Sequence, residues 1–195
     1  MLCLEMPCFG ARASMEENAT AKAFLWQGKT LFGRMLAELG AGIDFLVSHP
    51  GIDEQRIATL GISMGGTHAW WLAALDPRVA TCVQMCCFAD LAALIQTGAH
   101  DGHGAYMTVP GLLAITSTGT LAGLAAPRPQ LVCVGLQDAF TPPDAFEISR
   151  AELNAAYQAK GCSEAVHYVV VGNAGHEETA GMRQAALTFL RETIG

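Results

Sequence analysis

Short, nearly continuous hydrophobic runs alternate with amphipathic stretches along this chain. Five runs have the length and apolar composition of strands: Leu2–Met6, Arg56–Ile62, Val79–Cys86, Gln130–Gly135 and Val166–Val171. Because apolar and polar residues do not alternate regularly within them, we expect strands that are buried on both faces. Such strands, separated by helices, are typical of a parallel sheet covered by helices.

Apolar residues at three- and four-residue spacing predict helices between these runs. The predicted helices are Gly33–Ser48, Met64–Leu75, Asp144–Lys160 and about Glu178–Thr193. The fold class is therefore α/β, with a mostly parallel sheet flanked by helices in a single domain over residues 1–195. Val109–Pro127 has no charged residue, but it is too polar and too often interrupted by Gly and Pro for a membrane span. We expect a loop with short helical turns there, and residues 98–120 are a candidate lid or site-lining loop.

Composition supports a folded domain and excludes some partners. The chain has 195 residues, is 51% hydrophobic and 15% charged, and carries a net charge of −7. That much apolar surface argues against disorder, and the acidic balance argues against nucleic acid, which is bound mainly by Lys and Arg. Seven cysteines without a CxxC pair indicate reduced core residues, and no signal peptide is visible. We therefore expect a cytoplasmic protein with no membrane partner.

The sequence Gly61-Ile62-Ser63-Met64-Gly65 is a G-x-S-x-G motif between a predicted strand and a predicted helix. In such a turn the serine adopts an unfavourable backbone conformation that lifts its hydroxyl above the sheet. Gly61 and Gly65 are expected to remove side chains that would clash there. Ser63 is thus the candidate nucleophile, and the Met64 N–H at the helix N-terminus is the candidate first donor to an oxyanion.

A serine nucleophile needs a base, and the base needs a carboxylate that orients it. Asp138 follows the fourth predicted strand and His176 follows the fifth, at the sheet edge where α/β proteins bind ligands. Asp144 competes with Asp138 for the role of the acid. We favour Asp138, because Asp144 stands where the next helix needs an N-cap. The pair His100 and His103 is weak support for a metal and more typical of a site-lining or surface loop. No cofactor and no metal are expected.

These residues resemble the α/β-hydrolase superfamily, and specifically its dienelactone-hydrolase-like and acetyl-esterase-like members. The similarity is carried by residues 51–58 before the G-x-S-x-G motif, by residues 109–113 and 126–129, and by Gly175-His176-Glu177. It covers nearly the whole chain. The resemblance implies a serine carboxylesterase that hydrolyses short-chain esters through Ser63, His176 and Asp138. Dienelactone hydrolases themselves use a cysteine where this chain has Ser63.

The resemblance also implies that family members carry three further strands before the one that Leu2–Met6 resembles. For an α/β-hydrolase-like core lacking these first strands, three outcomes are open: the N-terminal strand moves inward, a second subunit supplies the pairing, or the chain is a fragment. We expect a homo-oligomer, a dimer or larger, that covers the open side of the sheet. Its second oxyanion donor is then expected from the Cys8 or Phe9 N–H. Two other readings stay open: a hydrolase-like binding or scaffold protein without catalysis, and a hydrolase of lactones or peptides on the same scaffold.

Overall fold

Four parallel strands form the centre of the protein in a computed structural model, which describes residues 1–13 and 16–195. The strands are β1 (Ile57–Ile62), β2 (Val79–Met85), β3 (Gln130–Gly135) and β4 (Val166–Val171). They lie side by side in the order β1-β2-β3-β4, and each neighbouring pair is parallel. Four of the five predicted strands are confirmed, with bounds that agree to within one residue.

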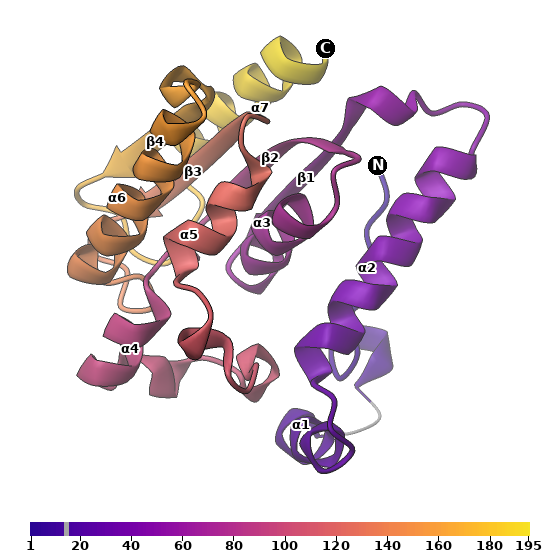
Figure 1. Ribbon diagram of the computed structural model, residues 1–195, viewed down its shortest axis with the longest axis vertical. Helices are drawn as coiled ribbons and strands as arrows, with labels where there is room; N and C mark the ends of the chain where they lie inside the picture. Colours follow the sequence, from indigo (N-terminus) through magenta and orange to yellow (C-terminus); the bar gives the residue numbers. More distant parts are fainter. Residues whose placement is uncertain (14–15) are drawn as a thin grey trace.

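Helices cover both faces of this sheet, as Figure 1 shows. The helices are α1 (Glu17–Trp26), α2 (Leu31–Ser48), α3 (Met64–Leu75), α4 (Leu91–Thr97), α5 (Thr118–Ala122), α6 (Pro143–Ala159) and α7 (Ala180–Ile194). Alternate residues of β3 point to opposite faces. Val132 and Val134 pack in the cluster that includes α3, α5 and α6, whereas Leu131 and Cys133 pack against α7. This alternation makes the sheet the middle layer of three.

All four predicted helices are present, with ends shifted by a few residues. α2 begins two residues earlier than predicted, because the Thr30 hydroxyl caps it by accepting a hydrogen bond from the Gly33 N–H. The Thr179 hydroxyl caps α7 in the same way, at the Met182 N–H. The region 109–127 consists of short helical turns, as expected from its glycines and prolines. Among the described helices no single one could span a membrane, although Ala105–Ala114 and Thr118–Ala125 reach the required length and composition as a pair bent by 95°.

The predicted strand Leu2–Met6 is wrong. This segment has no regular secondary structure and pairs with no strand among the described residues. Leu2 and Leu4 instead lie against α2 at Gly42, where an added Cβ would come within 2.7 Å of Leu4. Apolar packing on a helix produces the same hydrophobic run as a buried strand, so the pattern alone could not separate the two.

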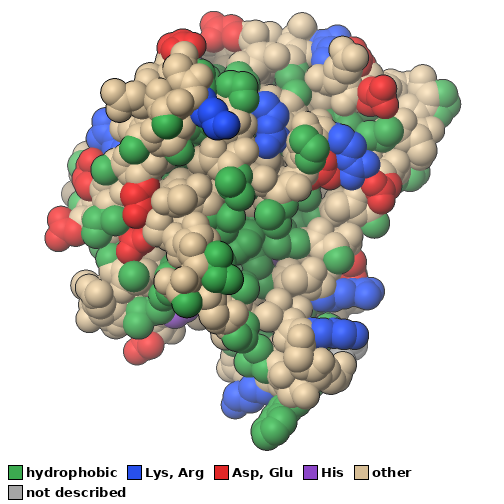
Figure 2. All heavy atoms as spheres, viewed as in Figure 1, with side chains coloured by type: hydrophobic (Ala, Val, Ile, Leu, Met, Phe, Trp, Pro, Cys, Tyr) green, Lys and Arg blue, Asp and Glu red, His purple; other side chains and the backbone are tan. Residues whose placement is uncertain are grey.

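A groove of about 330 Å³ separates this N-terminal segment and α2 from β1 and α3. Figure 2 shows hydrophobic side chains gathered along the middle of this face of the molecule. β1 is an edge strand, and its Leu60 is 53% exposed. An exposed edge with apolar side chains is prone to pair with another chain.

A chain of buried side-chain hydrogen bonds crosses the other half of the sheet. Gln84 of β2 donates to Gln130 of β3 at 3.3 Å, and Gln130 donates to the Tyr157 hydroxyl of α6 and the Ala122 carbonyl, both at 2.9 Å. Tyr157 in turn donates to the Arg128 carbonyl. All three side chains are almost completely buried: Gln84, Gln130 and Tyr157. Their hydrogen bonds to one another compensate for the water contacts that these polar atoms lose on folding.

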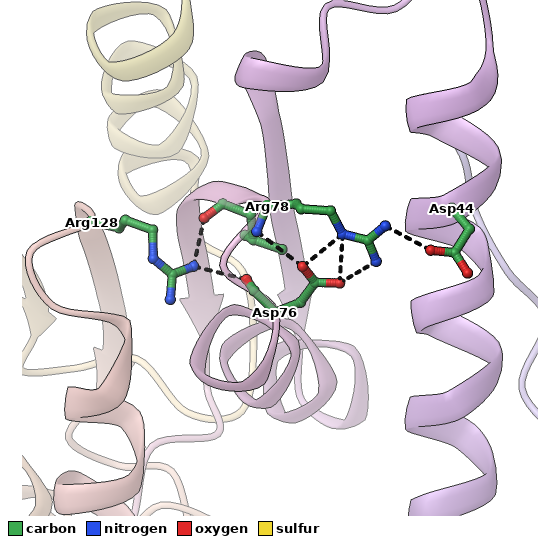
Figure 3. A network of polar contacts seen from close by, with 5 residues as sticks. Asp44, Asp76, Arg78 and Arg128 are labelled. Atoms are coloured by element: carbon green, nitrogen blue, oxygen red, sulfur yellow. Dashed lines mark hydrogen bonds and ion pairs between the residues drawn. The ribbon is translucent and has the colours of Figure 1, made fainter.

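Arg128 holds the end of α3 by its guanidinium group (Figure 3). It donates to the carbonyls of Asp76 and Val79 at 3.0 and 2.7 Å and also to the carbonyl of Ala73. The neighbouring Arg78 joins Asp76 to Asp44 of α2, but its side chain is 40% exposed. Arg128 is the more buried of the two, and burial lowers its pKa below the usual value. We infer that Arg128 contributes more to stability than Arg78, because exposed ion pairs contribute little.

Replacing Arg128 by Lys should lower the free energy of unfolding by about 2 kcal/mol, because one ammonium group cannot satisfy three carbonyls in a fixed fork. Arg78→Lys is the matched control and should leave the free energy of unfolding nearly unchanged, because its ion pairs are exposed. Urea unfolding followed by circular dichroism measures both. Equal losses in the two variants would contradict the importance given to Arg128.

The expected homo-oligomer stays a prediction, and light scattering after gel filtration tests it. A dimer or larger assembly is expected, compared with 20.5 kDa for one chain. Leu60→Lys places a charge on the exposed edge strand and should shift the protein toward the monomer. Leu75→Lys, at an equally exposed leucine in α3, should not. A monomeric wild-type protein would show the prediction to be wrong.

Candidate active site

Ser63 stands between β1 and α3 in a left-handed backbone conformation, with φ of 55°. Such a conformation costs a non-glycine residue about 1–3 kcal/mol, so the surroundings must hold it. The Ser63 N–H donates to the Met85 carbonyl of β2 at 2.9 Å, and the Ser63 carbonyl accepts from the Thr67 N–H of α3. The turn is thus tied to the neighbouring strand and to its own helix.

Two glycines let the strand and helix approach closely at this turn. A Cβ on Gly61 would lie 2.2 Å from the Gly65 carbonyl carbon, and one on Gly66 would lie 2.9 Å from the Met85 carbonyl oxygen. The expectation that Gly61 avoids a steric clash is therefore confirmed. At Gly65 it is wrong, because a Cβ there would contact nothing within 4 Å. Gly66, outside the five-residue motif, is the second constrained position.

The structure brings Ser63, His176 and Asp138 into one hydrogen-bonded line. His176 Nε2 lies 2.7 Å from Ser63 Oγ, and His176 Nδ1 lies 2.8 Å from Asp138 Oδ2. The carboxylate favours the imidazole tautomer with its proton on Nδ1. Nε2 then carries the lone pair and can accept the Ser63 hydroxyl proton.

Asp138 is held rigidly at the end of this line. Its side chain is fully buried. Oδ1 accepts from the Phe140 N–H at 2.8 Å, and Oδ2 accepts from the Thr141 hydroxyl at 2.9 Å in addition to His176. These donors compensate for the lost hydration of the carboxylate and fix its direction.

Asp144 does not occupy the position that the sequence analysis assigned to it. Pro142 is the N-cap of α6 and Pro143 is its first residue, so Asp144 is one position inside the helix. Prolines are well tolerated there, because the first N–H groups of a helix have no internal partner. Asp144 is exposed in the first turn, whereas Asp138 contacts His176.

The predicted oxyanion donors have different surroundings. Met64 is the first residue of α3, where a backbone N–H has no partner within the helix, and it lines the same cleft as Ser63. The Phe9 N–H donates to the Met6 carbonyl at 3.1 Å and is therefore engaged in a local turn. Cys8 has a left-handed φ of 73°. The Cys8 N–H as second donor stays a prediction.

A cleft of about 350 Å³ opens at the Ser63 hydroxyl. Besides Ser63, Met64 and His176, its walls include Phe9, Cys86, Cys87, His103, Tyr106 and Phe140. Phe140 packs against the His176 ring with centroids 4.8 Å apart. The loop reading of residues 100–103 is confirmed, since Gly102 and His103 line this cleft. Phe140 and Tyr106 were missed, because isolated aromatic residues in loops carry no distinctive signal.

The thiols in the cleft are poor competitors of Ser63 as nucleophiles. Burial, with a further contribution from Asp138, raises the pKa of Cys86 to about 11. Burial also raises the pKa of Cys87 well above its ordinary value. Both thiols are therefore protonated at neutral pH. Because only the thiolate is a good nucleophile, neither side chain competes with Ser63.

The two histidines of the loop stack on each other beside the cleft. The rings of His100 and His103 have centroids 5.4 Å apart, and His103 meets the edge of Phe140. Burial lowers the pKa of His103, and the neighbouring His100 lowers it further. Within the described part of the chain, no group of three or more His, Cys, Asp or Glu side chains could hold a metal ion.

Comparisons with known sequences found similar proteins. Residues 39–98, which include Ser63, match the family model described as "BAAT / Acyl-CoA thioester hydrolase C terminal". The chain is 38% identical over 186 residues to the "Putative hydrolase YtaP" of Bacillus subtilis (strain 168). That alignment covers 95% of this chain and 62% of the relative, so the chain spans less than two thirds of that protein's length.

Solved structures show the same fold. The glucuronoyl esterase catalytic domain from Hypocrea jecorina superposes with a TM-score of 0.69 at 21% identity, over 84% of this chain and 52% of that one. Acetyl xylan esterase 1 from Thermoanaerobacterium sp. JW/SL YS485 gives 0.60 at 22% identity, over 85% of this chain and 54% of that one. At these identities the likeness establishes the fold, and the chain spans about half the length of both structures.

Asp138→Asn should lower kcat for p-nitrophenyl acetate about 10⁴-fold, because the amide favours the wrong histidine tautomer. Asp144→Asn, the matched control, should leave kcat within about threefold, because its carboxylate is exposed at a helix start. Steady-state kinetics of both variants decides between the two carboxylates. A larger loss for Asp144→Asn would contradict the role of Asp138.

Proposed function

We propose that this chain, which has the α/β-hydrolase fold, is a serine carboxylesterase that cleaves small carboxylic esters through an acyl-enzyme. The observation that carries the proposal is the hydrogen-bonded line from Ser63 Oγ through His176 to the buried Asp138 carboxylate. Relatedness to a described hydrolase supports hydrolysis as the reaction class.

The geometry suits a two-step reaction. As Ser63 Oγ attacks the ester carbonyl carbon, His176 Nε2 takes the hydroxyl proton, and Asp138 stabilises the imidazolium that forms. The Met64 N–H donates to the negative carbonyl oxygen. His176 then gives its proton to the alcohol oxygen as the carbon–oxygen bond breaks. Water, activated by the same imidazole, releases the acid and restores Ser63.

A small uncharged ester suits the lining of this cleft. Most of the cleft wall is uncharged: burial lowers the pKa of His103 and raises the pKa of Cys86 and Cys87. Glu17 is the one carboxylate among the described residues that line it. The names of the structural neighbours, a glucuronoyl esterase and an acetyl xylan esterase, favour carboxylic esters as the first class to test. The family description adds acyl thioesters as a comparison substrate. Two alternatives remain: hydrolysis of lactones or peptides, and a binding or scaffold role without catalysis. The cytoplasmic location stays a prediction.

Ser63→Ala should abolish hydrolysis of p-nitrophenyl acetate and butyrate, with a loss in kcat of about 10⁶-fold, because no other group supplies the nucleophile. A fluorophosphonate probe should label the wild-type protein at Ser63 and leave the variant unlabelled. Ser163→Ala is the control and should behave as wild type. Ser163 is exposed, lies in the short turn before β4 and does not line the cleft.

Two results would contradict the proposal. Wild-type rates in Ser63→Ala would show that another group carries the reaction. Absence of both labelling and hydrolysis in the folded wild-type protein would instead favour the binding or scaffold reading, because labelling requires an activated serine.

A further inference from the structure

One carboxylate lies in the catalytic cleft and takes no part in the reaction proposed above. Glu17 is the first residue of α1, and its side chain lines the same cleft as Ser63 and His176. Glu17 Oε1 accepts a hydrogen bond from the Tyr106 N–H, in a loop far along the chain, at 2.9 Å. Glu17 Oε2 has no hydrogen-bond partner in the described part of the chain, so this oxygen is available to a ligand in the cleft.

Packing holds this carboxylate in place. Ala21, one helical turn after Glu17, is buried in the same hydrophobic cluster as Tyr106. The loop also passes very close to the carboxylate at Gly104, where an added Cβ would come within 2.6 Å of Glu17 Oε1. The start of α1 and this loop therefore form one packed unit, and the charge of Glu17 has a fixed place in the cleft wall.

No positive side chain among the described residues balances Glu17. The residues that line the cleft include neither Lys nor Arg, and none of the ion pairs in the described part of the chain involves Glu17. Burial lowers the pKa of the neighbouring His103, which keeps that ring neutral at pH 7. The N-terminus of α1 supplies only a partial positive charge. The electrostatic potential in the cleft is therefore negative.

We propose that Glu17 selects among esters by their charge: it favours an ester that carries a positive group and disfavours one that carries a negative group. The proposal rests on the esterase function proposed above. In a cleft of about 350 Å³, an ester bound at Ser63 lies within about one Debye length of Glu17, so water and salt screen their interaction only in part. Most of the wall suits an uncharged ester, and the carboxylate adds the discrimination between charged ones.

A carboxylate at the start of a helix also has a purely structural explanation, because it interacts favourably with the helix dipole. With that role alone, Glu17→Gln would lower stability and affect all esters alike. The side-chain oxygen of Gln can still accept the hydrogen bond from the Tyr106 N–H, so the substitution removes the charge and keeps the contact. The ratio of rates for charged and uncharged esters therefore separates the two roles.

Pairs of esters that have the same shape and differ in charge test the proposal. Acetylcholine is compared with its uncharged analogue, in which a tert-butyl group replaces the trimethylammonium group of the alcohol. Betaine ethyl ester and its tert-butyl analogue make the same comparison in the acyl part. The ratio of kcat/KM for the cationic and the uncharged ester should fall about tenfold in Glu17→Gln, in the pair whose charged part lies near Glu17. Comparing this ratio between protein variants cancels the intrinsic reactivity of each ester.

An anionic ester and added salt extend this test. Monoethyl succinate carries a free carboxylate, so its kcat/KM relative to ethyl butyrate should rise in Glu17→Gln. Added NaCl should lower the ratio of cationic to uncharged ester in the wild-type protein and leave it unchanged in Glu17→Gln, because salt screens the charge. Glu16→Gln is the matched control and should keep the wild-type ratios. Glu16 is exposed, directly precedes α1 and does not line the cleft.

The outcomes separate this proposal from the esterase function. Hydrolysis of the uncharged esters with unchanged ratios in both pairs would overturn the role of Glu17 and leave the esterase intact, whereas a wild-type protein that hydrolyses no ester would overturn both. An equal fall of the ratio in Glu16→Gln and Glu17→Gln would assign the effect to the acidic surface and overturn the proposal as well. If Glu17→Gln does not fold by circular dichroism, the wild-type protein decides: ratios that do not change with salt would count against Glu17.

Discussion

The strained backbone at Ser63 is the constraint on which the arrangement of the site depends. A residue with φ of 55° can stand between a strand and a helix only if both are fixed by their own packing. β1 and α3 meet this condition: the turn is bonded to Met85 of β2, and Gly61 and Gly66 allow contact distances that any side chain would prevent. Rigid elements thus hold the hydroxyl in the open cleft, and the strain is compensated by the core beneath.

Parallel topology supplies the other two groups from distant parts of the sequence. The strands end at the same edge, so the loops after β3 and β4 bring Asp138 and His176 to the hydroxyl that follows β1. Electrostatics then separates the roles of the groups at that edge. Asp138 accepts hydrogen bonds from three donors, whereas burial keeps the nearby thiols of Cys86 and Cys87 protonated. Ser63 is therefore the nucleophile that the carboxylate and the imidazole activate.

The sequence was most informative where one local cause decides the outcome. Buried parallel strands and the G-x-S-x-G turn have direct signatures, so β1 to β4 and the positions of Ser63, Asp138 and His176 at strand ends were predicted. The errors concern features that depend on neighbours far along the chain. Leu2–Met6 is apolar because it packs on α2, and the need for glycine at Gly66 arises from the Met85 carbonyl of another strand. The aromatic cleft wall depends on loops whose path no periodicity reveals.

The hydrogen-bonded chain from Gln84 through Gln130 to Tyr157 has a consequence for how this protein can change over evolution. Each side chain in it is buried and satisfies its neighbour, so losing one member leaves the next without a partner in a dry interior. Substitutions at these three sites are therefore expected to be strongly coupled, with paired exchanges tolerated better than single ones. The half of the sheet that carries Asp138 is therefore expected to change slowly.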